Sequence, residues 1–165
     1  VMPRSLPVFE RFLLIRAYGG EIALSDPALG AQGFLDLAKK IADATRGSVL
    51  MRQFENEDNS LAHLEGTGPE IWRQCGGRVD AFVCGAGTGG TARGCGAYLK
   101  QRSLGSTRVV VAEPVESRVL SSTQTVHHNH VLTGIGAGIN LPLLPPDCLA
   151  RARWRSGGGG PQPPL

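Results

Sequence analysis

Apolar and polar positions along this chain follow two periods, which predict helices and strands that alternate along the sequence. Helical periodicity covers residues 7–18 and 31–44, and short apolar runs typical of strands cover residues 21–24 and 48–51. A second unit of strand, loop, helix and strand follows over residues 79–113. Strands that alternate with helices usually pair in parallel, so the pattern predicts the fold class α/β, with a mostly parallel sheet and flanking helices.

A short helix is predicted around Trp72 by the residues that precede it. Thr67 and Glu70 have the spacing of a capping box, in which two side chains bind the free N–H groups of a first helical turn. Pro69 suits that turn, where its missing N–H would have no partner in any case. We therefore expect this helix to begin near Thr67.

The segment over residues 79–91 reads VDAFVCGAGTGGT, an apolar strand that runs directly into a glycine-rich loop. Its glycines are Gly85, Gly87, Gly89 and Gly90. Without a Cβ, these residues let the backbone take positive φ and direct several N–H groups at one anion. Thr88 and Thr91 add hydroxyl donors, and a helix predicted to begin near Thr91 adds the positive end of its dipole. The segment predicts an anion-binding site.

The same glycines also allow a different interpretation. Gly85, Gly87 and Gly90 satisfy G-x-G-x-x-G, and Glu113 follows a second strand in the manner of an acid that binds a ribose. A dinucleotide-binding oxidoreductase module therefore stays open on these residues. The flanking threonines favour capture of one terminal phosphate, and the lack of a Gly-Lys-Ser/Thr sequence excludes a P-loop.

Five motifs occur along the chain: QFEN at 53–56, TGPEIW at 67–72, GTGGT at 87–91, EPVES at 113–117 and GIGAG at 134–138. Their order is that of cysteine synthase, which is also called O-acetylserine sulfhydrylase or O-acetylserine (thiol)lyase. The chain resembles this family over residues 2–139. Cystathionine β-synthase shares the glycine loop, but the second and fourth motifs are more similar to cysteine synthase.

The resemblance implies a pyridoxal 5′-phosphate enzyme of fold type II, similar to the tryptophan synthase β chain. Such an enzyme replaces the acetoxy group on Cβ of O-acetylserine with sulfide and gives cysteine and acetate. It also implies that the cofactor phosphate is bound by Gly87, Thr88, Gly89, Gly90 and Thr91. By the same resemblance, Gln53 donates its amide to the substrate carboxylate and Gly136 lines the pocket.

The family's Schiff-base lysine has no counterpart here, because Lys39, Lys40 and Lys100 each fall on a predicted polar helix face. We therefore expect no catalytic residue in this chain, and a fragment that is inactive by itself. The resemblance assigns residues 1–52 to the later part of a smaller mobile domain and 53–144 to the early part of a larger cofactor-binding domain. Residues 145–165, rich in Arg, Gly and Pro, are expected to form a flexible tail unlike the family.

Other functions remain open. The family implies a homodimer, and its members bind the tail of serine acetyltransferase. The alternatives are a relative of cystathionine β-synthase or cyanoalanine synthase, and a catalytically dead binding protein of the same fold.

Composition narrows the class of partner. The 165 residues are 41% hydrophobic with 23 glycines, which is enough for one modest core. A net charge of +3, from 17 basic and 14 acidic residues, argues against a nucleic-acid surface, and no apolar run suggests a membrane span.

Cysteine and histidine positions add two expectations. No C-x-x-C pair occurs among Cys75, Cys84, Cys95 and Cys148, so free thiols in a reducing compartment, cytoplasm or plastid stroma, are expected. A histidine cluster follows a run of Ser, Thr and Gln with no element to orient it: His127, His128 and His130. We interpret this cluster as a polar loop and expect no metal site.

Overall fold

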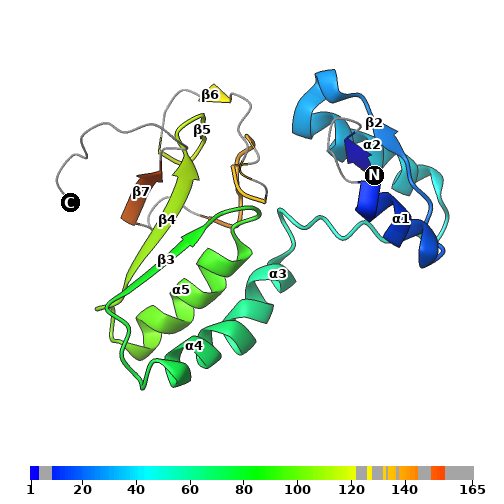
Figure 1. The fold of residues 1–165 in the computed structure, drawn as a ribbon. Helices are drawn as coiled ribbons and strands as arrows, with labels where there is room; N and C mark the ends of the chain where they lie inside the picture. The colour runs from blue at the N-terminus through cyan, green and yellow to red at the C-terminus, as the bar shows by residue number, and fades with distance from the viewer. Residues whose placement is uncertain are drawn as a thin grey trace. The chain divides into compact units, whose positions relative to one another are not determined.

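The computed structural model describes residues 1–3, 9–121, 126–127, 132, 134–136, 138–144 and 150–154. The chain forms two compact units, Val1–Met51 and Arg52–Leu165 (Figure 1). The proposed site residues all belong to the second unit, so this unit positions the site.

The first unit is a pair of helices with a minimal sheet. Its elements are β1 (Met2–Pro3), α1 (Phe9–Ala17), β2 (Leu24–Ser25), the 3₁₀ helix η1 (Pro27–Leu29) and α2 (Gly30–Ala44), and β1 pairs with β2 in parallel. The two predicted helices are confirmed. The strand predicted over residues 48–51 is wrong, because Val49 and Met51 are 81% and 69% exposed and no described strand pairs with them.

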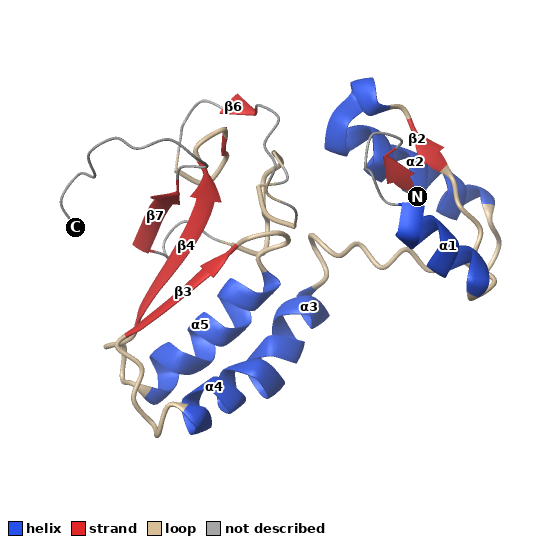
Figure 2. Ribbon diagram, in the orientation of Figure 1, coloured by secondary structure: helices blue, strands red, loops and turns tan. Residues whose placement is uncertain are grey.

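The second unit carries a three-stranded parallel sheet in the order β3-β4-β7. Its strands are β3 (Ala81–Gly85), β4 (Arg108–Pro114) and β7 (Ala150–Trp154), with a separate antiparallel pair of β5 (Ser117–Arg118) and β6 (Val126–His127). Its helical elements are α3 (Glu57–Ala62), the π-helix η2 (His63–Thr67), α4 (Gly68–Gln74) and α5 (Gly90–Arg102). Figure 2 shows α5 between the sheet and the α3–α4 segment, so the predicted α/β class with parallel strands is confirmed.

Two predictions need correction in this unit. The segment over residues 145–165 was expected to be a flexible tail, but Ala150–Trp154 forms β7 and pairs in register with Val110 to Pro114 of β4. The sequence ARARW has the period of two that is typical of a strand. The high Arg and Gly content of residues 145–165 conceals this period. His127 was placed in a polar loop, but its backbone lies in β6, whereas His128 and His130 lie outside the described residues.

The core lies where α5 packs against the sheet. Cys95 and Leu99 of α5 are fully buried, and Val109 and Val111 of β4 are each 2% exposed. Gly96 permits the close packing, because a Cβ at this position would lie 3.1 Å from Cγ2 of Val109. The helix is therefore held firmly on the strands that it connects.

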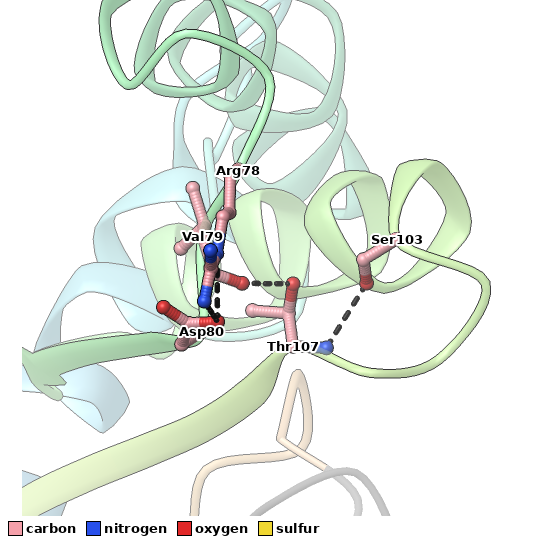
Figure 3. Close-up of polar contacts among 5 residues, drawn as sticks. All are labelled: Arg78, Val79, Asp80, Ser103 and Thr107. Atoms are coloured by element: carbon pink, nitrogen blue, oxygen red, sulfur yellow. Dashed lines mark hydrogen bonds and ion pairs between the residues drawn. The ribbon is translucent and has the colours of Figure 1, made fainter.

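A buried threonine fixes the far end of the strand–helix–strand unit (Figure 3). Thr107 is 1% exposed, its hydroxyl donates to the carbonyl of Val79 at 2.7 Å, and its N–H donates to Oγ of Ser103 at 3.0 Å. These bonds join the end of α5 to the starts of β3 and β4. The ion pair of Arg78 with Asp80 beside them is highly exposed and contributes little stability.

Candidate anion-binding site at the carboxyl end of β3

The glycine loop connects the carboxyl end of β3 to the first turn of α5. Gly89 is the N-cap residue of α5 and has a φ of +91°, which a residue with a Cβ rarely adopts. No side chain caps this helix. The first N–H groups of an uncapped helix require other acceptors, and an anion is well suited to that role.

The space around the loop permits no side chain at three of its glycines. A Cβ on Gly87 would lie 2.5 Å from the carbonyl oxygen of Gly134, and one on Gly89 would lie 2.5 Å from Cγ of Leu144. A Cβ on Gly90 would collide with the amide of Asn59. The loop is therefore a close-packed backbone cradle, and it fits a phosphate group that is bound by N–H donors.

Thr88 presents a hydroxyl whose oxygen already accepts two hydrogen bonds. Nδ2 of Asn59 donates to it at 2.8 Å, and the N–H of Gly90 donates at 3.3 Å. The same Nδ2 also donates to the carbonyl oxygen of Gln53 at 2.7 Å, so this atom must be the amide nitrogen. The Thr88 hydroxyl therefore keeps its own proton, which it can donate to an anion. The side-chain amide of Asn59 also links the loop to the backbone of Gln53.

Thr91 forms part of a second polar chain. Its Oγ1 lies 3.0 Å from Nε2 of His63, and Nδ1 of that imidazole lies 2.9 Å from Oγ1 of Thr67. Thr67 therefore does not cap a helix, and the predicted capping box with Glu70 is wrong. The helix α4 does begin at Gly68, as expected, but η2 leads directly into it, so the backbone at Thr67 is already helical and its hydroxyl bonds to His63 instead.

Sequence reasoning missed Asn59 and His63, although a signal was present. With Thr67 they recur every four residues, which places three polar side chains on one helix face. In the structure Asn59 and His63 on this face reach the loop and the first turn of α5. The motifs that carry the family resemblance, at 53–56 and 67–72, lie on either side of these two residues.

Gly136 lies beside the loop, and Glu113 is occupied elsewhere. The N–H of Gly136 donates to the carbonyl of Ala86 at 3.3 Å. Glu113 is 4% exposed, and its two carboxylate oxygens accept from the N–H groups of Leu120 and Ser121 at 3.0 and 2.9 Å. Because both oxygens hold backbone donors, this carboxylate is not available to bind a ribose.

Within the second unit, neither Lys100 nor the cysteines Cys84 and Cys95 add a reactive group to the loop. Lys100 lies about 15 Å along α5 from its first residue, ten residues away. In the first unit, Lys39 pairs with Asp43 on the exposed face of α2. Burial raises the pKa of the Cys84 thiol to about 11, with the neighbouring Cys95 as a second cause, and burial also raises the pKa of Cys95. These two thiols stay protonated at neutral pH and pack as small apolar groups.

Within the described part of the chain, no three His, Cys, Asp or Glu side chains come together as a metal site would need. None of its helices has the length and apolar character to cross a membrane.

Curated relatives of the chain are cysteine synthases. It is 42% identical over 139 residues to cysteine synthase 3 of Caenorhabditis elegans, covering 84% of this chain and 40% of the relative. It is 39% identical over 144 residues to cysteine synthase B of Campylobacter jejuni, covering 87% and 47%. The chain thus spans less than half the length of either relative.

Solved structures show the same fold. A cysteine synthase from Entamoeba histolytica matches with a TM-score of 0.79 and 31% identity, over 90% of this chain and 43% of that one. An O-acetylserine dependent cystathionine β-synthase from Helicobacter pylori matches with a TM-score of 0.81 and 29% identity, over 93% and 49%.

The family comparison decides between the two interpretations of the glycine loop. The matching family model, described as pyridoxal-phosphate dependent enzyme, covers residues 1–156. The likeness therefore continues to residue 156 and includes β7, so the expectation that the chain is unlike the family from residue 145 onward is wrong. The chain belongs to the pyridoxal-phosphate dependent enzyme family, and not to the dinucleotide-binding oxidoreductases.

Proposed function

We propose that this chain carries the cofactor-phosphate site and part of the substrate pocket of a cysteine synthase. The observation that carries the proposal is the Thr88 hydroxyl, which accepts two hydrogen bonds and keeps its proton for an anion beside the uncapped first turn of α5. Pyridoxal phosphate, when bound, supplies the electron sink for the replacement chemistry. The chain's own contribution is to hold the phosphate end of that cofactor.

Each site residue has a role in this proposal. The phosphate is held by the N–H and O–H donors of Gly87, Thr88, Gly89, Gly90 and Thr91, with the N–H of Gly90 shared with Oγ1 of Thr88. Gln53 donates its amide to the carboxylate of the substrate, and its backbone is joined to the loop through Asn59. Gly136 lines the pocket next to the loop, where its N–H is bonded to Ala86.

The substrates of the whole protein follow from the same proposal. They are O-acetylserine and sulfide, which give cysteine and acetate by β-replacement, and the active protein is a homodimer that also binds the serine acetyltransferase tail. The sequence setting of Lys39, Lys40 and Lys100 does not match that of the family's Schiff-base lysine, so the 165 residues alone are expected to make no cysteine.

A second candidate is the activity of the Helicobacter pylori neighbour, an O-acetylserine dependent cystathionine β-synthase. Both enzymes use the same first substrate and differ in the thiol that attacks. The motifs TGPEIW and EPVES favour sulfide. Competition between sulfide and a larger thiol for O-acetylserine separates the two candidates.

Substitution of Gly89 tests the cofactor site. Gly89→Asp introduces a Cβ at a φ of +91° and 2.5 Å from Cγ of Leu144, and it adds a negative charge to the loop, so the protein should lose pyridoxal phosphate on gel filtration. Gly105→Asp is the matched control, because Gly105 has a φ of +87° and open space around its Cβ position. Equal retention of the cofactor by the two variants would contradict the site, as would tighter binding of NAD than of pyridoxal phosphate.

A further inference from the structure

His63 engages both of its ring nitrogens between two threonines. Nε2 lies 3.0 Å from Oγ1 of Thr91, and Nδ1 lies 2.9 Å from Oγ1 of Thr67. A neutral imidazole carries one N–H, so it donates at one of these atoms and accepts at the other. The position of that proton decides what Thr91 can do.

The two tautomers have opposite consequences for the loop. With the proton on Nδ1, Nε2 accepts, and Thr91 spends its hydroxyl proton on the imidazole. With the proton on Nε2, the imidazole donates to Thr91 Oγ1, and the hydroxyl proton remains for another acceptor. A phosphate dianion is an acceptor only, so it can bind the Thr91 hydroxyl in the second case alone.

Thr88 shows the same arrangement with a fixed donor. Its oxygen accepts from Asn59 Nδ2, an atom whose bond to the Gln53 carbonyl excludes the reverse orientation. Thr88 is therefore a donor toward the anion in every state of the protein. Thr91 becomes its equivalent only when His63 donates at Nε2.

The π-turn of η2 places the Thr67 hydroxyl beside the other ring nitrogen of His63, Nδ1. The N–H of Gly68 donates to the carbonyl of His63, five residues earlier, which marks the wide turn of η2. Thr67, which belongs to this turn, places its hydroxyl within bonding distance of Nδ1. A hydroxyl can donate where Nδ1 accepts, so Thr67 is suited to hold the Nε2–H tautomer.

We propose that His63 is a positioning residue that carries its proton on Nε2, with Thr67 donating to Nδ1, and thereby directs the Thr91 hydroxyl proton at the bound phosphate. The inference rests on the proposed role of the loop in binding the cofactor phosphate. It adds His63, which lies outside the loop, as the residue that decides whether the Thr91 hydroxyl can donate to the phosphate.

Nitrogen-15 spectra of the imidazole groups test the tautomer directly. In protein saturated with inorganic phosphate, and separately with pyridoxal phosphate, we expect the His63 signals to show a protonated Nε2 and an unprotonated Nδ1. The signals that vanish in His63→Gln identify this residue among the four histidines. Protonation at Nδ1 in the saturated protein would overturn the proposal.

Phosphate affinity provides the second readout. His63→Phe and Thr67→Val should each bind inorganic phosphate about tenfold to a hundredfold more weakly, the range of one hydrogen bond to a charged acceptor. His63→Gln should recover most of the affinity, because its amide can donate to Thr91. Thr45→Val, which removes a hydroxyl bonded to the Ile41 carbonyl on α2, is the control and should bind normally.

The outcomes separate this inference from the proposed function. Thr67→Val keeps the imidazole, so it remains informative even if His63→Phe fails to fold. Unchanged affinity in Thr67→Val, or a His63→Gln variant as weak as His63→Phe, would overturn the positioning role alone. Failure of the unsubstituted protein to bind either phosphate or pyridoxal phosphate would instead overturn the proposed function, and the inference with it.

Discussion

Replacement of Asn59 by alanine should loosen the glycine loop and the segment of Gln53 together. Nδ2 of Asn59 donates to the Gln53 carbonyl at 2.7 Å and to Thr88 Oγ1 at 2.8 Å. The side chain is half-buried, so water can replace these bonds only in part. Asn59→Ala therefore removes an amide that links the phosphate loop to the backbone of the proposed substrate residue.

The size of the effect follows from the two lost bonds. A neutral hydrogen bond contributes about 0.5–1.5 kcal/mol net, so the free energy of unfolding should fall by about 1–3 kcal/mol. Thr88 also loses the donor that orients its hydroxyl, and we expect the affinity for pyridoxal phosphate to fall by up to about tenfold. The loop glycines are unaltered, so binding should weaken without being abolished.

Urea denaturation and titration with pyridoxal phosphate measure the two quantities on the same samples. Asn56→Ala is the matched control, because Asn56 is the N-cap of the same helix and accepts from the N–H of Asp58 at 3.0 Å. Loss of this cap should lower the free energy of unfolding by about 1 kcal/mol and leave the affinity for pyridoxal phosphate unchanged. Equal affinities of Asn59→Ala and Asn56→Ala would refute the link through Asn59.

Two other predictions concern the proposed pocket and the buried thiol. Gln53→Ala in an active protein should raise the KM for O-acetylserine and leave cofactor binding unchanged, since it removes one donor to a carboxylate; loss of the cofactor itself would contradict this role. Burial raises the pKa of Cys84 to about 11 from a usual 9.0, so the unfolded chain loses the thiol proton at a lower pH than the folded protein does. Stability should therefore fall as the pH rises from about 9 to 11, and iodoacetamide at pH 9 should label the exposed Cys75 before Cys84; the reverse order of labelling would count against the assignment.

The unit from β3 to β4 could be predicted from the sequence because its signals are local. A short apolar run, closely spaced glycines and a helical period each specify a backbone conformation without reference to distant residues. Gly89 has the positive φ that the loop pattern requires, and α5 begins at Gly90, one residue from the predicted position.

The errors occurred where a distant partner decides the structure. The run over residues 48–51 is apolar but pairs with no strand among the described residues, whereas the Arg-rich run of β7 pairs with β4. Thr67 and Glu70 have the correct spacing for a cap, but the Thr67 hydroxyl bonds to His63 within a continuing helix. Spacing along the sequence cannot show which of two available partners a hydroxyl will bind.

Glycines outside the loop are as necessary to this site as those within it. A Cβ on Gly94 of α5 would collide with the carbonyl of Ser60, and one on Gly68 would lie 2.8 Å from Cβ of Tyr98. The absence of side chains at these positions lets α5 approach the α3–α4 segment closely. Only at that approach do Asn59 and His63 reach the two threonine hydroxyls, so the donors that would hold a phosphate depend on helix packing as well as on the loop itself.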